Sequence, residues 1–406
     1  MAVRQQALTL VAPVRASVLE GLSERLDAAE SDVQEALEAV TSLHFARFVL
    51  LDGPRGPGTR LAFESNHDGD LGPHLASLSK ALAPFEELLF GSWEGYQKDD
   101  LQGFVDKHAV SASTFYLGHP GLTVPQILSD RDLRGRLETL LDEEVDGHDL
   151  EGESAVSVRK RVLGRLSGEL TTGPIDRGLP PQPASAIVFW TLVVLVVVPL
   201  VVVLVPLALV VEWNERRTEP KRELTPDGDP RLDPINRRED SITQNGLTHH
   251  VALRPGVYRR TVFRVVLWFL ETTRQLISYE GQLNGIGSIH FARWVLLEDD
   301  TVLFFSNYDG SWEAYLGDFV DKAHLYLTAV WSNTRWFPDA NALVLAGAAR
   351  ETEFKQWTRT FQVENRIWYS AYRTLTVSQV LDNALIREGA SGDMTEKQAR
   401  SWLALL

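Results

Sequence analysis

A nine-residue segment occurs twice in this chain, and the repeat limits the possible folds more than any other feature of the sequence. Leu43–Leu51 read LHFARFVLL, and Ile289–Leu297 read IHFARWVLL. The similarity continues upstream, where residues 7–15 match residues 246–254, and it extends downstream to the end of each half. Such self-similarity indicates that two similar domains were joined in one chain.

Each copy has the same predicted order of elements, namely strand, helix, strand, strand, helix, strand and a terminal helix. Thr123 and Thr376 stand in front of the two terminal helices, where threonine favours the N-cap position. The order βαββαβ is that of a ferredoxin-like unit, in which an antiparallel sheet carries both helices on one face. We therefore expect an α+β fold with two tandem ferredoxin-like domains that form a barrel-like sandwich.

A long apolar run separates the two copies. Between Ala186 and Val211 the only polar side chain is that of Thr191. As a helix the run would be roughly 39 Å long, which exceeds the ~30 Å hydrocarbon core of a bilayer. Pro199 and Pro206 lie inside the run and favour a bend. The pattern predicts a membrane segment, either a single transmembrane helix or a re-entrant hairpin.

These patterns divide the chain into five parts. They are residues 1–146, the first ferredoxin-like domain; 147–184, a linker; 185–213, the transmembrane or re-entrant segment; 214–242, a charged linker; and 243–406, the second ferredoxin-like domain.

The basic residues that flank the apolar run indicate its orientation. Arg216 and Arg217 follow the run closely, which places the C-terminal half in the cytoplasm by the positive-inside rule. We therefore expect a membrane protein, single-pass or monotopic, with the lipid bilayer as a partner. The sequence leaves open whether the two halves lie on the same side of that bilayer.

Composition excludes several classes of function. The chain carries 55 acidic and 40 basic residues, a formal charge of −15, whereas a nucleic-acid-binding surface is basic. There is no cysteine, which excludes disulfides, thiolate metal sites and thiol catalysis. We expect no nucleic-acid partner and no metal site, and the ferredoxin-like sheets offer a surface for a homo-oligomer.

Charged residues recur at matching places in both copies. Strand alternation places His44 and Arg47 on opposite faces of one strand, and an arginine on such an apolar strand needs a carboxylate partner. Asp68 and Asp309 are the expected partners, across the hairpins, of Arg47 and Arg293. The four charged residues are candidates for a catalytic or ligand-binding set at the join of the sheets. The reading that the sequence favours is a structural bracket that joins strand to turn in both halves.

Two ferredoxin-like halves with an Asp-Gly pair after a strand resemble the dimeric α+β barrel superfamily and, distantly, the dye-decolorising peroxidases. The pairs are Asp68-Gly69 and Asp309-Gly310, each preceded at a distance of three residues by serine in place of the first glycine of that family's motif. The resemblance implies that the aspartate assists peroxide cleavage and that a histidine of the second half ligates haem iron. His324, on a helix predicted from Ser311 to Trp331, is the candidate ligand.

Three functional hypotheses follow. The first is a binding or interaction module at the membrane face, without a recognised catalytic set. The alternative is a membrane-bound, haem-dependent peroxidase-like oxidoreductase of the α+β barrel type. The sequence does not decide whether the protein is an enzyme, and a scaffold for oligomerisation also fits.

Overall fold

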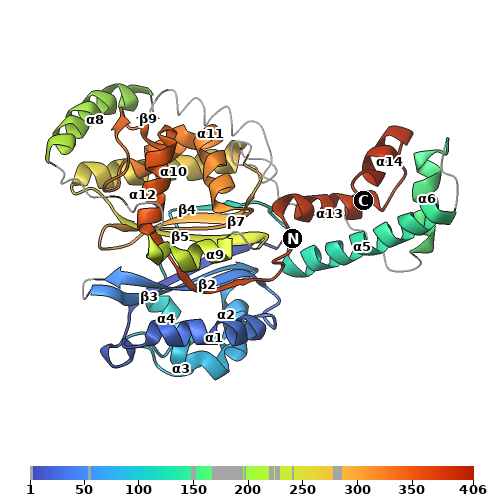
Figure 1. Cartoon of the computed structure of the whole chain (residues 1–406), viewed down its shortest axis with the longest axis horizontal. Helices are drawn as coiled ribbons and strands as arrows, with labels where there is room; N and C mark the ends of the chain where they lie inside the picture. Colours follow the sequence, from blue (N-terminus) through green and yellow to red (C-terminus); the bar gives the residue numbers. More distant parts are fainter. Residues whose placement is uncertain are drawn as a thin grey trace.

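The computed structural model describes residues 3–53, 56–147, 152–166, 195, 198–218, 224, 229–239, 242–277 and 286–406. The chain has an α+β fold with two antiparallel sheets and helices around them (Figure 1). The strands are β1 (Gln5–Pro13), β2 (Leu43–Gly53), β3 (Gly56–Asp68), β4 (Thr114–Leu117), β5 (Gln244–Ala252), β6 (Ile289–Leu296), β7 (Thr301–Asp309), β8 (Ala340–Asn341), β9 (Leu345–Ala346), β10 (Gln362–Val363) and β11 (Asn365–Ser370). The α-helices are α1 (Leu22–Leu37), α2 (Leu71–Ala81), α3 (Glu86–Leu89), α4 (Leu101–His108), α5 (Val124–Gly147), α6 (Ala155–Arg165), α8 (Val198–Thr218), α9 (Asp233–Glu239), α10 (Val257–Ile277), α11 (Trp312–Trp331), α12 (Glu351–Phe361), α13 (Val377–Gly389) and α14 (Glu396–Leu403).

The two halves exchange their last strands. The first sheet has the order β1-β3-β2-β11, and the second has the order β10-β5-β7-β6-β4. Strand β11 of the second half pairs with β2, so that Trp368 lies opposite Arg47. Strand β4 of the first half pairs with β6, so that Phe115 lies opposite Arg293. Neither sheet is complete without a strand from the other half.

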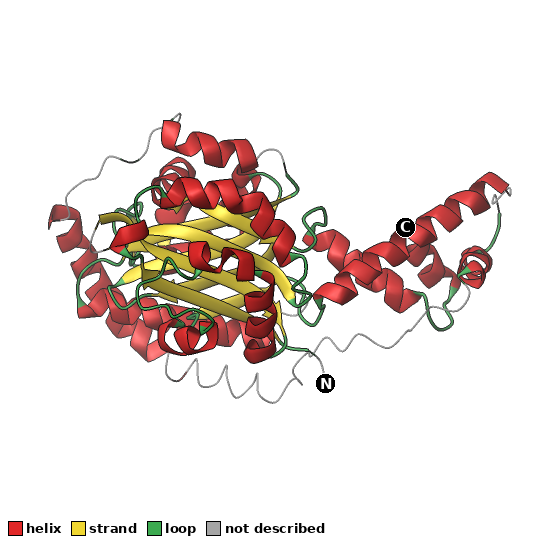
Figure 2. Ribbon diagram, turned by 90° about the horizontal axis from the view of Figure 1, so that it is seen from below, coloured by secondary structure: helices red, strands yellow, loops and turns green. Residues whose placement is uncertain are grey.

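The sheets pack face to face, and helices cover their outer faces (Figure 1 and Figure 2). Residues of both sheets form one shared apolar cluster, which includes Val49 and Leu51 of β2 and Val295 of β6. On the outer faces α1, α2 and α4 cover the first sheet, and α10, α11 and α12 cover the second. The central strands β2 and β6 are therefore buried on both faces, which explains why the repeated segment is apolar almost throughout.

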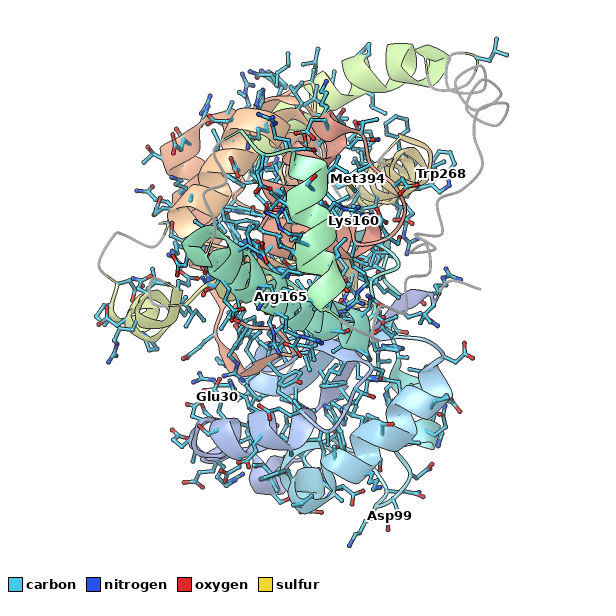
Figure 3. The ribbon with its side chains drawn as sticks, turned by 90° about the vertical axis from the view of Figure 1, so that its right-hand side faces the viewer. Glu30, Asp99, Lys160, Arg165, Trp268 and Met394 are labelled. Carbon is cyan, nitrogen blue, oxygen red and sulfur yellow. The ribbon has the colours of Figure 1, made fainter. Side chains whose placement is uncertain are left out.

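An arm of four helices extends from the body (Figure 1). It consists of α5 and α6 from the first half and α13 and α14 from the second, around a core that includes Leu137, Val162 and Ile386. Trp402 donates a hydrogen bond from its indole N–H to the carbonyl of Ile386 at 2.9 Å. In Figure 3 the arm faces the viewer, with Lys160 labelled on α6.

Several predicted helices are confirmed, and one differs. Helix α11 spans Trp312–Trp331 as expected, and Thr376 caps α13 with a complete capping box. The repeat predicts one helix of the same length in the first half, because Phe90 lies 21 residues after Gly69 as Trp331 lies 21 residues after Gly310. Instead, α2 ends at Ala81 and the chain continues in shorter helical segments. Pro84 lies at that break, where its ring and missing N–H disfavour a continuous helix.

The predicted membrane segment is wrong. In the part of the chain that the structure describes, no helix combines the length and the apolar character that a bilayer crossing requires. Residues 185–194 and 196–197 lie outside the described residues. Helix α8 contains the remainder of the run, and its later turns are charged and attached to the second half. The Glu212 carboxylate accepts hydrogen bonds from the backbone N–H groups of Ala342 and Leu343, at 3.0 and 2.9 Å.

The exchanged strands give a second reason for the correction. A single membrane crossing between the halves would place them on opposite sides, whereas β4 and β11 each pair with the sheet of the other half. Together with the lack of a spanning helix among the described residues, this makes the predicted single-pass or monotopic location, and the orientation that depended on it, wrong. The interaction module at a membrane face and the membrane-bound haem peroxidase both required that segment and are wrong as stated. The five domain boundaries stay a prediction.

Candidate functional site

A β-bulge in each repeated strand turns an additional side chain into the space between the sheets. The pairing of β2 with β3 shifts register between Leu43 and Phe45, and that of β6 with β7 shifts between Ile289 and Phe291. His44, between the shifted residues, contacts the ring of Phe291 across the interface at a centroid distance of 5.1 Å. Strict alternation predicts that His44 and Arg47 lie on opposite faces of β2. The bulge instead turns the His44 side chain toward the other sheet, the side on which Arg47 lies.

The two repeated histidines belong to a buried run of polar side chains, which we call the polar chain. It consists of Asp68, His44, Tyr372, His119, His290 and Asp309. In the first half, Nε2 of His44 lies 2.9 Å from Oδ1 of Asp68, and Nδ1 lies 2.8 Å from the Tyr372 hydroxyl. The tyrosine follows the exchanged strand β11, so this link joins the two halves.

The second half repeats the arrangement with one substitution. Nε2 of His290 lies 2.7 Å from Oδ1 of Asp309, and Nδ1 lies 3.3 Å from Nε2 of His119. His119 follows β4 as Tyr372 follows β11, and the Tyr372 hydroxyl lies 3.2 Å from Nε2 of His119. The polar chain therefore crosses the middle of the molecule from Asp68 to Asp309 without a break.

One set of proton positions satisfies the polar chain. A carboxylate only accepts, so Nε2 of His44 and Nε2 of His290 carry the protons that face the aspartates. With both of these imidazoles neutral, the Tyr372 hydroxyl donates to Nδ1 of His44, and Nε2–H of His119 donates toward the tyrosine oxygen and Nδ1 of His290. Burial, and then the nearby His290 and His44, hold the pKa of His119 well below 6.5, while burial raises the pKa of Tyr372 well above 10. Neutral side chains thus fill the centre.

The aspartates at the ends of the polar chain also anchor the helical arm. The second carboxylate oxygen of Asp68 accepts from the backbone N–H of Val124 at 2.8 Å, and that of Asp309 accepts from Val377 at 2.7 Å. These residues open α5 and α13, where N–H groups have no partner inside the helix. Each aspartate therefore links a histidine between the sheets to the first turn of an arm helix.

A layer of buried charge lies beside the polar chain. Arg47 donates from Nε to Glu64 at 2.7 Å, and Arg293 reaches the other oxygen of Glu64 at 2.5 Å. The sequence had predicted Asp68 and Asp309 as the partners of these arginines, but the aspartates bind the histidines. Glu64 has no acidic counterpart in the second half, because Phe305 occupies that place in the repeat.

A cleft of about 420 Å³ opens where the halves meet. It lies between α1 of the first half and α9, the start of β5 and the β10–β11 segment of the second half. Its lining residues are Glu30, Gln34, Ile235, Glu239, Ile242, Thr243, Gln244, Asn245, Gly246, Gln362, Val363, Glu364, Asn365, Trp368, Arg373 and Thr374. Figure 3 labels Glu30 on α1.

Hydrogen bonds connect the wall of the cleft to the buried charge layer. Trp368 donates from Nε1 to Oδ1 of Asn307 at 3.0 Å, and Arg47 donates to the same oxygen. Asn365 accepts from the Thr248 hydroxyl at 2.6 Å, and that hydroxyl accepts from Arg47 at 3.2 Å. Arg47 thus fixes two side chains of the wall from behind.

The cleft contacts the polar chain through Gln244, and the absence of a side chain at Gly246 leaves room for the indole of Trp368 in its wall. Gln244 lines the cleft, and its amide nitrogen lies 3.2 Å from Nε2 of His290. Gly246 lies under the indole of Trp368, where an added Cβ would stand 2.4 Å from the indole nitrogen. A side chain at position 246 would therefore displace Trp368.

The structure places the predicted site residues in one interior region, with one exception. Arg47 and Arg293 form the charge layer, and Asp68 and Asp309 end the polar chain; a catalytic role for these four stays a prediction. His324 lies apart on α11, with Nδ1 3.0 Å from the carbonyl one turn earlier in the same helix. Within the described ranges no group of three or more potential ligands could hold a metal ion.

Sequence reasoning missed Glu64, His119 and Tyr372. A signal was present for two of them, because Phe115-Tyr116 matches Trp368-Tyr369 in the repeat. His119 and Tyr372 each stand three residues after the tyrosine of that pair. Comparison of the chain with protein-family models, with curated proteins and with solved structures found no match. The geometry of the site therefore carries the functional argument alone.

Proposed function

We propose that this protein binds a small organic amine in the cleft, on a scaffold of two ferredoxin-like units that form one α+β barrel, as in the superfamily that the sequence resembles. The sheet orders support the scaffold, because each half supplies three adjacent strands in the order first, third, second, and takes the fourth from its partner half. The observation that carries the binding proposal is the cleft itself, which both halves line.

The size and position of the cleft suit a ligand site. Pockets of about 300–1,000 Å³ are typical of small-molecule sites, and they occur preferentially between domains. The wall residues Trp368 and Asn365 are held by Asn307 and Thr248, so their positions are set before any ligand arrives. A wall that is already ordered loses little freedom on binding.

The lining favours an amine over an acid. Three carboxylates line the cleft, those of Glu30, Glu239 and Glu364, against one guanidinium, that of Arg373. Glu239 is buried and pairs with Arg359 at 2.8 Å, and Glu364 pairs with Arg366 at 2.9 Å. The half-exposed carboxylates of Glu30 and Glu364 are the acceptors that an ammonium group in the cleft would meet. Trp368 and the half-exposed Ile242 add apolar surface for a flat hydrocarbon group.

A matched pair of probes tests this proposal by isothermal titration calorimetry. Tryptamine and indole-3-acetate share an indole ring and differ in the sign of their charge. We expect tryptamine to bind one site per chain and indole-3-acetate to bind at least tenfold more weakly. Equal binding of the two probes, or binding of neither, would contradict the proposal.

Two variants of α1 locate the charge that is recognised. Glu30→Gln removes a carboxylate of the lining, and Glu35→Gln removes an exposed one from the same helix. We expect the first variant to weaken tryptamine binding several-fold and the second to leave it unchanged. The same loss in both variants would show attraction to the overall negative charge and not recognition in the cleft.

A further inference from the structure

The interior of the two-sheet body is asymmetric in charge. Two facing rows of side chains run across the sheets at the level of the repeated arginines. The first row is Thr9, Glu64, Arg47 and Trp368, and the second is Thr248, Phe305, Arg293 and Phe115. The rows correspond position by position through the repeat, but only the first contains a carboxylate.

Arg47 has a partner on every donor nitrogen. Nε binds Glu64, Nη1 donates to the carbonyl of Leu247 at 2.9 Å and to the Thr248 hydroxyl at 3.2 Å, and Nη2 donates to the Ser306 carbonyl and to Asn307. Its own half supplies the carboxylate, and the facing row supplies the hydroxyl. The repeat predicts the same two kinds of partner for Arg293, a carboxylate from its own half and a hydroxyl from the facing row.

Arg293 lacks half of that arrangement. Nη2 binds Glu64 and donates to the Ser65 carbonyl at 3.2 Å, while Nε and Nη1 have no partner among the described residues. The Thr9 hydroxyl, which corresponds to that of Thr248, is also without a partner there, as is Oδ1 of Asn66. Arg293 is 1% exposed, so bulk water does not satisfy these groups.

The layer also carries an excess of positive charge. The guanidinium groups of Arg47 and Arg293 share the one carboxylate of Glu64. The Phe305 ring offers only cation–π contacts, with its centroid 5.5 Å from Cζ of Arg47 and 5.7 Å from Cζ of Arg293. Burial lowers the pKa of Arg293 to about 10, so it keeps its charge at neutral pH. A buried net positive charge with N–H groups that lack acceptors is strongly unfavourable.

We propose that a small monovalent anion of chloride size binds between the sheets, on the Nε and Nη1 edge of Arg293 with the Thr9 hydroxyl as a third donor. The anion supplies the negative charge that a carboxylate at position 305 would supply. It restores neutrality to the layer and gives partners to three donor groups. Its function is to hold the two sheets together, because Arg293 belongs to one sheet and Thr9 to the other.

Anion exchange at constant ionic strength tests the proposal on the unmodified chain. Melting temperatures are measured in sodium chloride, sodium bromide and sodium gluconate at equal sodium concentration. Since gluconate is too large for the position, we expect melting temperatures about 3 °C higher in chloride and bromide, with saturation as their concentration rises. Equal melting temperatures in all three salts would overturn the proposal.

Two variants of one residue connect the effect to this position. Phe305→Glu supplies the missing carboxylate, and we expect it to abolish the difference between chloride and gluconate. Phe305→Leu stays uncharged, and we expect it to keep that difference. A chloride effect that persists in Phe305→Glu, or disappears in Phe305→Leu, would contradict the assignment.

Anomalous diffraction from crystals grown in sodium bromide needs no variant. The expected result is a bromide peak within hydrogen-bonding distance of Nε or Nη1 of Arg293. Electron density for water alone at that place would overturn the proposal, whatever the salt dependence of stability. The melting, variant and diffraction experiments do not involve the cleft, so their outcomes are independent of amine binding.

Discussion

The Tyr372 hydroxyl lies 2.8 Å from Nδ1 of His44, although the two residues are 328 positions apart in the chain. The contact exists because β11, which precedes Tyr372, pairs with β2 of the first half. His119 makes the corresponding contact with His290 after β4. The exchange of strands thus brings each repeated histidine against a side chain of the other half.

Removal of this hydroxyl is expected to destabilise the fold. In Tyr372→Phe, Nδ1 of His44 is left buried without a donor, and His119 loses an acceptor. We expect a loss of about 2 kcal/mol in the free energy of unfolding, measured by urea denaturation at pH 7.5. Tyr326→Phe, at a half-exposed position on α11, is the control and should change stability little. Equal stability of the two variants would show that the polar chain adds nothing.

Buried neutral histidines predict a specific loss of stability in acid. His249 packs against Trp331 and Trp357 with no polar partner on either ring nitrogen in the described structure, and burial lowers its pKa to about 3. The unfolded chain takes up this proton near pH 6.5, whereas the folded chain does not. This contribution is therefore complete above about pH 6.5 and is lost as the pH falls toward 3.

The variant His249→Leu isolates the contribution of His249 to the pH dependence of the unfolding free energy. Between pH 7.5 and pH 5 we expect the unmodified chain to lose about 2 kcal/mol more of its unfolding free energy than the variant does. Denaturation curves at the two pH values give the comparison. Parallel losses in both proteins would mean that His249 is protonated in the folded state or that the variant repacks the site.

Gly246 is expected to be necessary for the cleft wall. In Gly246→Ala the new methyl group would stand 2.4 Å from the Trp368 indole nitrogen, so the indole must move and lose its bond to Asn307. We predict at least tenfold weaker tryptamine binding by calorimetry. Gly135→Ala on α5, where an added Cβ meets nothing within 4 Å, serves as the control and should bind as the unmodified chain does.

Much of the fold follows from the repeat. There is a physical reason why the repeat does not predict the remaining strand pairings. Residue correspondence gave the order of elements and the capping threonine Thr376, because both depend on local sequence. It could not give the sheet partner of β4 or β11, since a strand pairs equally well with its own sheet or with an equivalent one. The same limit hid the contact of Tyr372 with His44.

The site was only partly predictable for similar reasons. Strict alternation was expected in β2 and β6, but one bulge in each strand changes which side chains face inward. Glu64 went unnoticed because its counterpart, Phe305, is apolar. The run before Val211 looked like a bilayer span because its composition is apolar, yet the last turns of α8 are charged and bind the second half.

Exchange of strands predicts that the halves depend on one another. Separate chains of residues 1–146 and 243–406 each lack one strand of their own sheet. We expect each chain alone to show broad amide spectra by NMR, and the equimolar mixture to give one folded heterodimer by size-exclusion chromatography. Two independently folded halves that do not associate would show that each can close its own sheet.

The most direct test of amine binding is a crystal structure of the protein with tryptamine. The expected result is electron density for the indole ring beside Trp368, with the ammonium group within about 3 Å of a carboxylate of Glu30 or Glu364. Tryptamine bound elsewhere, or an empty cleft at saturating concentration, would contradict the proposed function.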